Sequence, residues 1–392
     1  AASTPSLLRP RLEPHGVSAT LDARLSTPLG VLSQTGIVGA TTRARVNALR
    51  LDTSWSWSDP VSLTTLRAGD SISSGLAWTR PVRFGGLQAQ SNFGLRPDLV
   101  TLPLPSLEGT AAVPSTLDVY VGATKAYSAR VEEGPWRISD LPLLGSGSAR
   151  IVLRDSSGRE VEQETPFFST PLLLRPGLMD WSAEIGFARR SYGALSDDYA
   201  RKPMVSASLR RGVASWLTLS AHVEGAPRLA LVGAGATLRV FDRGALDVAG
   251  SFSRAGAERG AQLYAAFETR LAGVTLSLSS QRTFGTYTDL AAVTAAPTAR
   301  APGLGVAHGG VDPLLRTLTV APPRAVDRIA ASFPLPFDAS HLSLALTRID
   351  APERGRTLLA SAGWSRRGPF GGALFLNGFV NLAKGDATRP SA

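Results

Sequence analysis

The chain has 392 residues, 43% of them hydrophobic and only 18% charged, which is below the roughly 25% charged residues usual in soluble domains. The net charge is +10, and all but three of the 41 basic residues are arginines spread along the chain, so no nucleic acid is expected as a partner. Cysteine is absent, which excludes disulfides, thiolate metal sites and cysteine nucleophiles. The chain has no apolar run of about 18 residues, so no transmembrane helix is expected.

The first part of the chain alternates apolar and polar residues after an irregular, proline-containing start over residues 1–15. The first residues lack a basic region followed by an apolar core, so a signal peptide is expected to have been removed. Neighbouring side chains of a strand point to opposite faces, so each alternating segment has one apolar and one polar side. Strands are expected within residues 17–26, 36–58, 64–70 and 84–90, with glycine-containing breaks at Gly75 and Gly85–Gly86.

Between residues 96 and 177 the pattern changes to short strands separated by turns with Gly and Pro. Strands are expected at 117–121, 127–131, 150–154 and 161–168, and turns at 133–135, 145–149 and 155–158, where Gly adopts positive φ at little steric cost. Trp136, Ile138 and Leu141 are expected to be buried. About 60–70 residues form a minimal β-sandwich, which gains stability from being held at both ends.

After residue 177 the alternation resumes, for example over 217–224 and 230–240. Strands of about ten residues with this alternation are typical of transmembrane β-barrels, because every backbone group in lipid must be paired. We therefore expect an all-β fold, a transmembrane antiparallel β-barrel with an inserted small β-sandwich plug domain. The expected division is 1–101 for the first barrel strands, 102–169 for the plug inside the barrel, and 170–392 for the remaining strands. Residues 291–313 are interpreted as a long loop or a lumen-facing excursion.

Several short motifs, in this order, resemble the middle domain of the outer membrane fimbrial ushers. They are Gly134-Pro135-Trp136-Arg137-Ile138-Ser139-Asp140-Leu141, Gly145-Ser146-Gly147, Asp155–Gly158 and Phe168-Ser169-Thr170-Pro171-Leu172-Leu173-Leu174-Arg175-Pro176-Gly177. The flanking segments 67–70, 84–88, 209–213 and 233–235 resemble usher barrel strands, so the resemblance covers about residues 60–255. Trp136 stands where the family commonly has Phe, and Gly85 where Arg is commoner.

The resemblance implies a pore and not an enzyme. It implies a protein of the bacterial outer membrane that accepts periplasmic chaperone–pilin subunit complexes, orders donor-strand exchange by β-strand addition, and passes the pilus fibre through a lumen gated by the plug. The expected partners are these complexes, the fibre and outer membrane lipid, and no cofactor is expected. The family's N-terminal and C-terminal periplasmic domains are not recognisable, so a partial chain is expected, in which roughly 320 residues outside the plug form about 16–20 strands.

The resemblance also assigns candidate functional residues. The plug core and turns would be formed by Gly134, Pro135, Trp136, Ile138, Asp140, Leu141 and Gly158, and the exit from plug to barrel by Phe168, Ser169, Pro171, Arg175 and Gly177. On polar strand faces, Arg43, Arg45, Arg210 and Arg239 would line the lumen. These arginines either pair with plug acids such as Glu132, Glu133, Asp140, Glu160 and Glu162, or are only solvated.

Other residue patterns point to little chemistry. The histidines 15, 222, 308 and 341 are far apart, so each is interpreted as a lone polar residue and not as a zinc ligand. The segment 233–235 is interpreted as close strand packing, because it lacks the last Gly of a dinucleotide motif. Asp197 and Asp198 are either a calcium site on a loop or a solvated pair. The tryptophans 55, 57, 78, 181, 216 and 364 either form interfacial girdles or pack inside.

Two alternative functions remain open on the sequence alone. A plugged porin-like channel for small solutes has the same strand pattern, and a secreted β-sandwich adhesin also has alternating strands. The adhesin would be soluble without detergent, whereas both membrane proteins would require it.

Overall fold

The computed structural model describes residues 17–40, 46–104, 107–121, 124–138, 141, 146–155, 159–241, 243–271, 273–295, 321–335, 340–352, 355–368 and 372–382. Within these residues, sixteen strands form one antiparallel sheet that keeps chain order except at one place, where β5 pairs directly with β12. The strands are β1 (Val17–Thr27), β2 (Gly30–Ala40), β3 (Val46–Asp59), β4 (Thr64–Ile72), β5 (Arg83–Ser91), β12 (Met179–Arg189), β13 (Tyr199–Ala214), β14 (Leu217–Ala226), β15 (Leu229–Val240), β16 (Gly244–Ala255), β17 (Glu258–Leu271), β18 (Val274–Gly285), β19 (Ala325–Pro334), β20 (Ser340–Ala351), β21 (Gly355–Arg367) and β22 (Ala373–Asn381).

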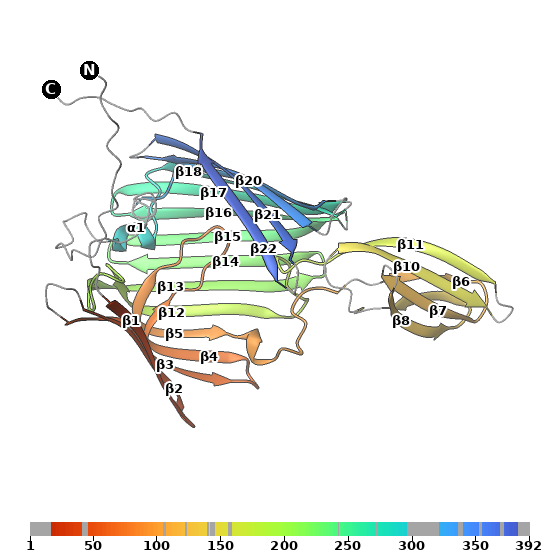
Figure 1. Ribbon diagram of the computed structural model, residues 1–392, viewed down its shortest axis with the longest axis horizontal. Helices are drawn as coiled ribbons and strands as arrows, with labels where there is room; N and C mark the ends of the chain where they lie inside the picture. Colours follow the sequence, from red (N-terminus) through yellow and green to blue (C-terminus); the bar gives the residue numbers. More distant parts are fainter. Residues whose placement is uncertain are drawn as a thin grey trace, which may run out of the picture.

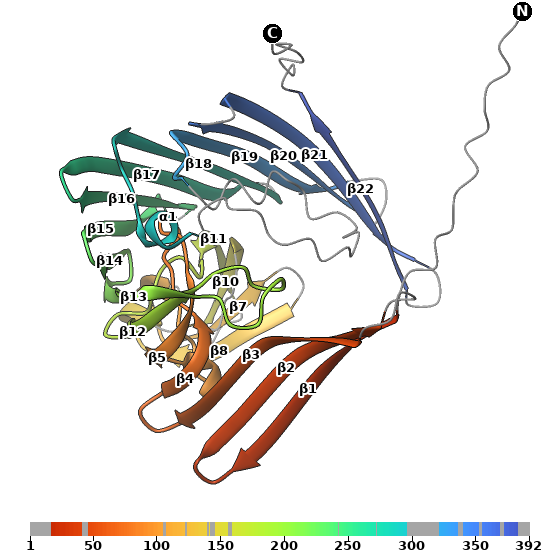
Figure 2. The same ribbon diagram turned by 90° about the vertical axis from the view of Figure 1, so that its left-hand side faces the viewer.

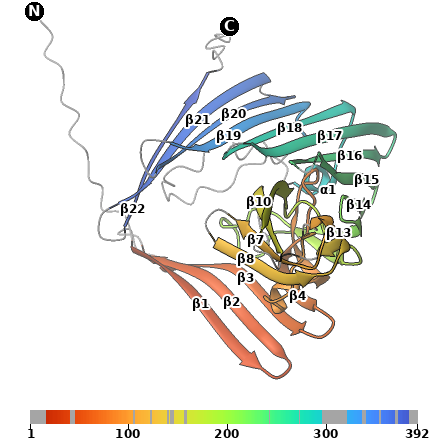
Figure 3. The same ribbon diagram turned by 90° about the vertical axis from the view of Figure 1, so that its right-hand side faces the viewer.

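The sheet curves around an enclosed space. In Figures 2 and 3, which look along the strands, it bends from β1 through β12–β15 to β22. Among the described residues, β1 pairs with β2 and β22 pairs with β21, so these strands form the two ends of the sheet. The described part of the chain contains one short α-helix, α1 (Leu290–Thr294), and one 3₁₀ turn, η1 (Phe93–Leu95). Neither has the length and apolarity that a helix needs to cross a membrane.

The two faces of this sheet have the opposite character to those of a soluble protein. On the inner face, polar side chains such as Glu184, His222 and Ser251 are almost completely buried. On the outer face, Val232 is 57% and Phe252 69% exposed. Buried polar rows and a continuous exposed apolar surface are unfavourable in water but are what a barrel wall in lipid requires. The expected all-β, membrane-spanning fold is therefore confirmed, and the adhesin alternative does not fit.

The insertion between β5 and β12 is a separate β module. Its strands are β6 (Leu107–Ala111), β7 (Ser115–Val121), β8 (Thr124–Val131), β9 (Gly134–Ile138), β10 (Ser146–Asp155) and β11 (Glu160–Phe168). They form a four-stranded sheet in the order β11-β10-β7-β8 and a two-stranded sheet of β6 and β9. The barrel register continues across the insertion, because Gly86 of β5 pairs with Gly186 of β12.

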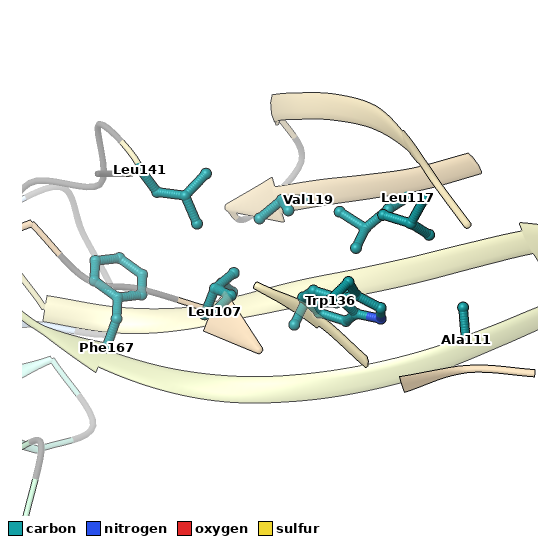
Figure 4. Packing of buried hydrophobic residues seen from close by; sticks show 10 residues of the cluster. Leu107, Ala111, Leu117, Val119, Trp136, Leu141 and Phe167 are labelled. Atoms are coloured by element: carbon teal, nitrogen blue, oxygen red, sulfur yellow. The ribbon is translucent and has the colours of Figure 1, made fainter. Parts of the chain in front are cut away.

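The module has its own hydrophobic core, shown in Figure 4. Leu117 and Val119 of β7 are completely buried, and they pack in one cluster with Trp136, Leu141 and other apolar side chains of the module. Lys125 Nζ and Ser128 Oγ donate to the Asp118 carboxylate at 2.8 and 2.6 Å, and these bonds hold the pKa of Asp118 below its ordinary value. This contribution to stability is present at neutral pH and is lost as the pH falls through the folded-state pKa of Asp118.

The module lies beyond the ends of the barrel strands (Figure 1), in line with the enclosed space (Figures 2 and 3). From the sequence, the module is expected inside the barrel. The structure places it outside, beyond the strand ends. A physical reason is that another segment, residues 73–82, already covers part of the inner wall next to the linkers of the module. The boundaries of 102–169 for this domain stay a prediction.

Two local expectations for the module were wrong. Ser146 and Gly147 do not form a turn but begin β10, and Gly134 and Pro135 begin β9 rather than completing a turn. In both places backbone pairing with a neighbouring strand, Ser146 with Phe168 and Gly134 with Ala111, outweighs the turn preference of Gly.

The orientation of the two faces predicts opposite effects for arginine at two adjacent positions of β18. Leu278 points outward between Phe267 and Ile329, whereas Ser277 points inward opposite Glu268. Leu278→Arg is expected to lower the free energy of unfolding by about 2–4 kcal/mol, because the charge would face hydrocarbon. Ser277→Arg is expected to cost less than about 1 kcal/mol. Urea titration in lipid vesicles measures both, and equal costs would contradict a lipid-facing outer surface.

The module core predicts a second effect, limited to the module. Leu117→Ala removes a completely buried side chain and is expected to lower the free energy of unfolding of the module by about 2–5 kcal/mol. Protease resistance of the module in the intact protein, measured against urea concentration, reports this change. Val161→Ala, at a position that is 53% exposed, is the control and is expected to stay within about 0.5 kcal/mol of the parent.

Candidate functional site on the inner face of the sheet

Residues 73–82, which join β4 to β5, cross the inner face of the sheet. We call them the inner loop. Ser73 N donates to Val82 O at 2.9 Å and closes its base, and Thr79 N donates to Leu76 O at 3.1 Å near its tip. Figure 1 shows this segment, in orange, passing over β13–β15, and Figure 2 shows it inside the curve of the sheet. A tight turn is long enough to join two neighbouring strands. The additional residues of the inner loop place side chains inside the barrel.

Trp78 anchors the tip of the inner loop and is only 3% exposed. Its ring meets the ring of His222 edge to face at 5.9 Å, and its carbonyl oxygen accepts a 2.6 Å hydrogen bond from Gln262 Nε2. Gly233 pairs with His222 across the strands, and a Cβ there would lie 2.6 Å from the indole ring. Glycine at position 233 is therefore required to make room for the tryptophan.

Arg80 fastens the inner loop to the segment that carries α1. Its guanidinium binds both carboxylate oxygens of Asp289, at 2.6 and 2.5 Å. Asp289 also caps α1 by accepting from Ala292 N at 2.9 Å, and Leu290 N donates to Glu224 Oε2 at 2.6 Å. The inner loop, α1 and strand β14 are thus linked by a short chain of charged contacts.

A row of polar groups on β12–β14 lies under the inner loop. Glu184 Oε1 accepts from Ser74 N at 3.0 Å, and Ser208 Oγ donates to Ser74 O at 3.4 Å. His222 lies between two of these groups, with Nδ1 at 2.8 Å from Ser208 Oγ and Nε2 at 3.0 Å from Glu224 Oε1. The four wall side chains in this row are at least nine-tenths buried.

Two linkers connect the module to the sheet beside this site. Arg175 N of the second linker, residues 169–178, donates to Thr101 O of the first at 2.7 Å, so the two leave the barrel together. The second linker is held to the wall by a 2.7 Å bond from Arg210 Nη2 to Leu172 O and a 2.8 Å bond from Leu174 N to Thr218 Oγ1.

A cavity of about 360 Å³ separates the inner loop from the second linker. Ser74–Trp78 and Pro171–Leu172 form two of its sides, and the wall contributes Asp180, Arg210 and Asp247 among others. Asp247 accepts from Thr237 Oγ1 at 3.1 Å. A movement of either the loop or the linker therefore changes the shape of a space that both of them line.

A second charged cluster lies at the end of the barrel away from the module. The side chains of Arg189 and Asp70 are almost fully buried and form an ion pair at 3.2 Å. Arg50 pairs with the same Asp70, and Tyr199 Oη donates to it at 2.5 Å. Arg50 also binds Ser196 O at 2.8 Å. These contacts hold residues 190–198, which connect β12 to β13, and the start of β13 against β3 and β4.

The structure places the candidate residues of the module as follows. Trp136 and Leu141 are buried, Ile138 packs against the same cluster, and Gly134 and Pro135 begin β9. Phe168 ends β11, and Ser169, Pro171, Arg175 and Gly177 lie in the second linker. Arg43, Arg45, Asp140 and Gly158 lie outside the described residues.

The expected pairs between wall arginines and module acids do not form among the described residues. Glu160 and Glu162 pair with Arg154 and Arg150 of the module itself. Arg210 binds the second linker and lies 3.8 Å from Asp180, and Arg239 donates to Ser215 Oγ at 3.4 Å. The ion pairs between β10 and β11 join residues that are close in the chain, whereas pairs between module and wall would join distant residues. The pairs within the module therefore form whichever position the module takes.

The calcium interpretation of Asp197 and Asp198 does not fit. Asp197 pairs with Arg50 at 3.0 Å and Asp198 with Arg190 at 2.7 Å. No cluster of three or more His, Asp or Glu side chains suited to a metal ion occurs in the described part of the chain.

Sequence reasoning missed the inner loop. The sequence indicates only a break at Gly75 and a lone polar residue at His222, and it leaves Trp78 open between an interfacial girdle and packing inside. A signal was present, because Trp78 and Arg80 stand in a segment too long for a tight hairpin turn. Nothing in the sequence indicates that the partners of this segment are residues 222, 262 and 289.

Comparison with known proteins gives one consistent family. Residues 51–291 match the family model for outer membrane usher proteins. The outer membrane usher protein FasD of Escherichia coli is 28% identical over 193 residues, 49% of this chain and 23% of FasD. The usher FimC of Bordetella pertussis is 28% identical over 153 residues, 38% of this chain and 17% of FimC. The chain thus spans less than a quarter of the length of these two relatives.

Two solved structures have the same fold. The E. coli P pilus tip assembly intermediate PapC-PapD-PapK-PapG aligns with 94% of this chain and 45% of that chain, at a TM-score of 0.62 and 14% identity. The P pilus usher (PapC) translocation pore aligns with 93% of this chain and 74% of that chain, at a TM-score of 0.50 and 16% identity. At these identities the likeness concerns the fold alone. Because the family model matches more than half of the chain, the chain belongs to the family of outer membrane usher proteins.

Proposed function

We propose that this chain is the pore-forming part of an usher that passes chaperone-delivered pilin subunits through the outer membrane and assembles them into a surface fibre. One observation carries this proposal: the residues that match the usher family also form a polar-lined, curved sheet with a folded module inserted on two linkers. The related assembly intermediate contains PapC together with PapD, PapK and PapG, which supports chaperone–pilin complexes as the partners. The proposed role includes no catalytic step and no cofactor.

The module is the proposed gate. It stands at one end of the enclosed space, held by linkers that are hydrogen-bonded to each other and to the wall. Movement of the module into the lumen would block passage, and arrival of a chaperone–pilin complex would favour the outer position. Arg43, Arg45, Arg210 and Arg239 remain the proposed lumen-lining arginines, and residues 102–169 the proposed plug domain.

Removal of the module tests the pore directly. Because Thr101 O and Arg175 N are hydrogen-bonded, a short Gly-Ser segment can replace residues 105–169 without moving either end. The deletion variant is expected to give large, continuous conductance in planar bilayers, whereas the parent opens rarely. Exclusion of polyethylene glycols of increasing size measures the lumen. A lumen too narrow for a folded pilin domain would favour the porin-like channel instead.

Assembly is tested in cells that lack their own ushers. The full-length protein, expressed with a periplasmic chaperone and its pilin subunits, is expected to produce fibres visible by electron microscopy. The module-deleted variant inserts in the membrane but lacks the gate, and is expected to reduce fibre number strongly. Absence of fibres with the parent protein, despite normal insertion and pilin levels, would contradict the assembly function.

The contact of Arg210 with the second linker predicts a change in gating. Arg210→Ala removes a charge-assisted hydrogen bond to Leu172 O, of the kind that contributes about 1.5–3 kcal/mol when well formed. Because the Arg210 side chain is partly exposed, a shift of about fivefold in the frequency of opening is expected in bilayer recordings. Arg211→Ala, an exposed neighbour on the outer face, is the control. An unchanged frequency in Arg210→Ala would show that this contact does not hold the gate.

A further inference from the structure

We propose that His222 is a proton-controlled positioning residue that sets how firmly the inner loop is held against the barrel wall. The consequence for the pore rests on the proposed function, but attachment of the loop is a property of these residues alone. Within the described chain, His222 is the residue that contacts both the Trp78 ring of the loop and Glu224, the carboxylate that holds Leu290 N at the start of α1. It is 2% exposed, so bulk water does not provide alternative partners.

The hydrogen bonds around His222 depend on its charge. A neutral imidazole has one donor and one acceptor nitrogen, whereas the imidazolium donates from both. Nδ1 lies 2.8 Å from Ser208 Oγ, and Nε2 lies 3.0 Å from Glu224 Oε1. A serine hydroxyl has a single hydrogen to donate, and Ser208 Oγ also lies 3.4 Å from Ser74 O of the inner loop.

In the charged state every one of these contacts is made. His222 donates from Nε2 to Glu224 and from Nδ1 to Ser208 Oγ, so the Ser208 hydrogen is left for Ser74 O. In the neutral state the remaining hydrogen stays on Nε2, because a lone pair there would face the Glu224 carboxylate. Nδ1 then accepts the Ser208 hydrogen, and Ser74 O loses its donor. Deprotonation of His222 therefore removes one hydrogen bond between wall and loop.

Charged groups from several elements lie around this attachment. Glu224 lies on the same strand, Glu184 on β12 binds Ser74 N, and Asp289 lies beside α1. Arg80 of the loop is engaged by Asp289, and Tyr287 shares a hydrogen bond with Ser251. Histidine is the residue type whose charge ordinarily changes between about pH 5 and 8, so pH is the variable that tests the relay.

The absence of native cysteine makes a direct measurement simple. A spin label on Ala77→Cys, at the exposed tip of the loop next to Trp78, reports loop mobility in the full-length protein in lipid vesicles. From pH 5.5 to pH 8.0 the mobile fraction is expected to rise about fivefold, the factor that corresponds to one neutral hydrogen bond of about 1 kcal/mol. An unchanged spectrum over this range overturns the proposal.

Matched variants separate the proposed relay from a general effect of pH. In the labelled protein, Ser208→Ala and His222→Gln are each expected to abolish the pH dependence. Ser220→Ala, on the same inner face two residues from His222, and His341→Gln, at an exposed position on β20, are expected to keep it. A pH dependence that persists in Ser208→Ala overturns the relay, and this variant carries the test if His222→Gln fails to insert.

Parallel bilayer recordings distinguish failure of the inference from failure of the proposed function. The frequency of opening is expected to rise with the mobile fraction of the label. A label whose mobility depends on pH, in a protein that gives no conductance steps, would support the relay and contradict the pore function. Conductance steps in a protein whose label mobility does not depend on pH would contradict the relay and support the pore function.

Discussion

The structure depends on one constraint, that a continuous ladder of backbone hydrogen bonds must face hydrocarbon on its outer side. Antiparallel pairing from β1 to β22 satisfies the backbone, and the alternation along each strand sends apolar side chains outward. The same alternation necessarily collects polar groups inside. Where these groups are covered and lose water, as Glu184 and Glu224 do, each needs a partner, since an unpaired buried charge costs several kcal/mol.

The inner loop supplies those partners. Ser74 N of the loop donates a hydrogen bond to Glu184, and Arg80 binds Asp289. Trp78 fills the space that Gly233 leaves beside His222. The loop thus completes a polar cluster, while its Val82 packs in an apolar one with Phe84 and Met204. Hydrogen bonds and ion pairs are directional and can be exchanged one for another, so these polar contacts suit the adjustable attachment that we propose for the loop.

The sequence predicts the strands, the insertion and the family because each depends on local pattern. Val232 and Gly233 alternate outward and inward in β15 as their residue types require, and the motif around Trp136 belongs to a module that folds on its own contacts. The site depends instead on partners far apart in the chain, such as Arg80 with Asp289. No local pattern encodes these pairings, and charged residues on a strand face are equally compatible with solvent. For the same reason the sequence leaves open whether the wall arginines pair with module acids or are solvated, and Glu160 pairs instead with the nearer Arg154.

The position of the module follows from how few contacts hold it. Its core is internal, so the module keeps its stability wherever it stands, and a movement changes mainly the contacts of its linkers. These include the bonds of Leu172 to Arg210 and of Leu174 to Thr218, each worth about 1–3 kcal/mol. A partner that binds one position about a hundredfold more tightly than the other supplies about 2.7 kcal/mol, which is enough to reverse such a balance. The gate that we propose, held weakly and folded independently, can thus be controlled by binding at the mouth of the pore without any rearrangement of the barrel wall.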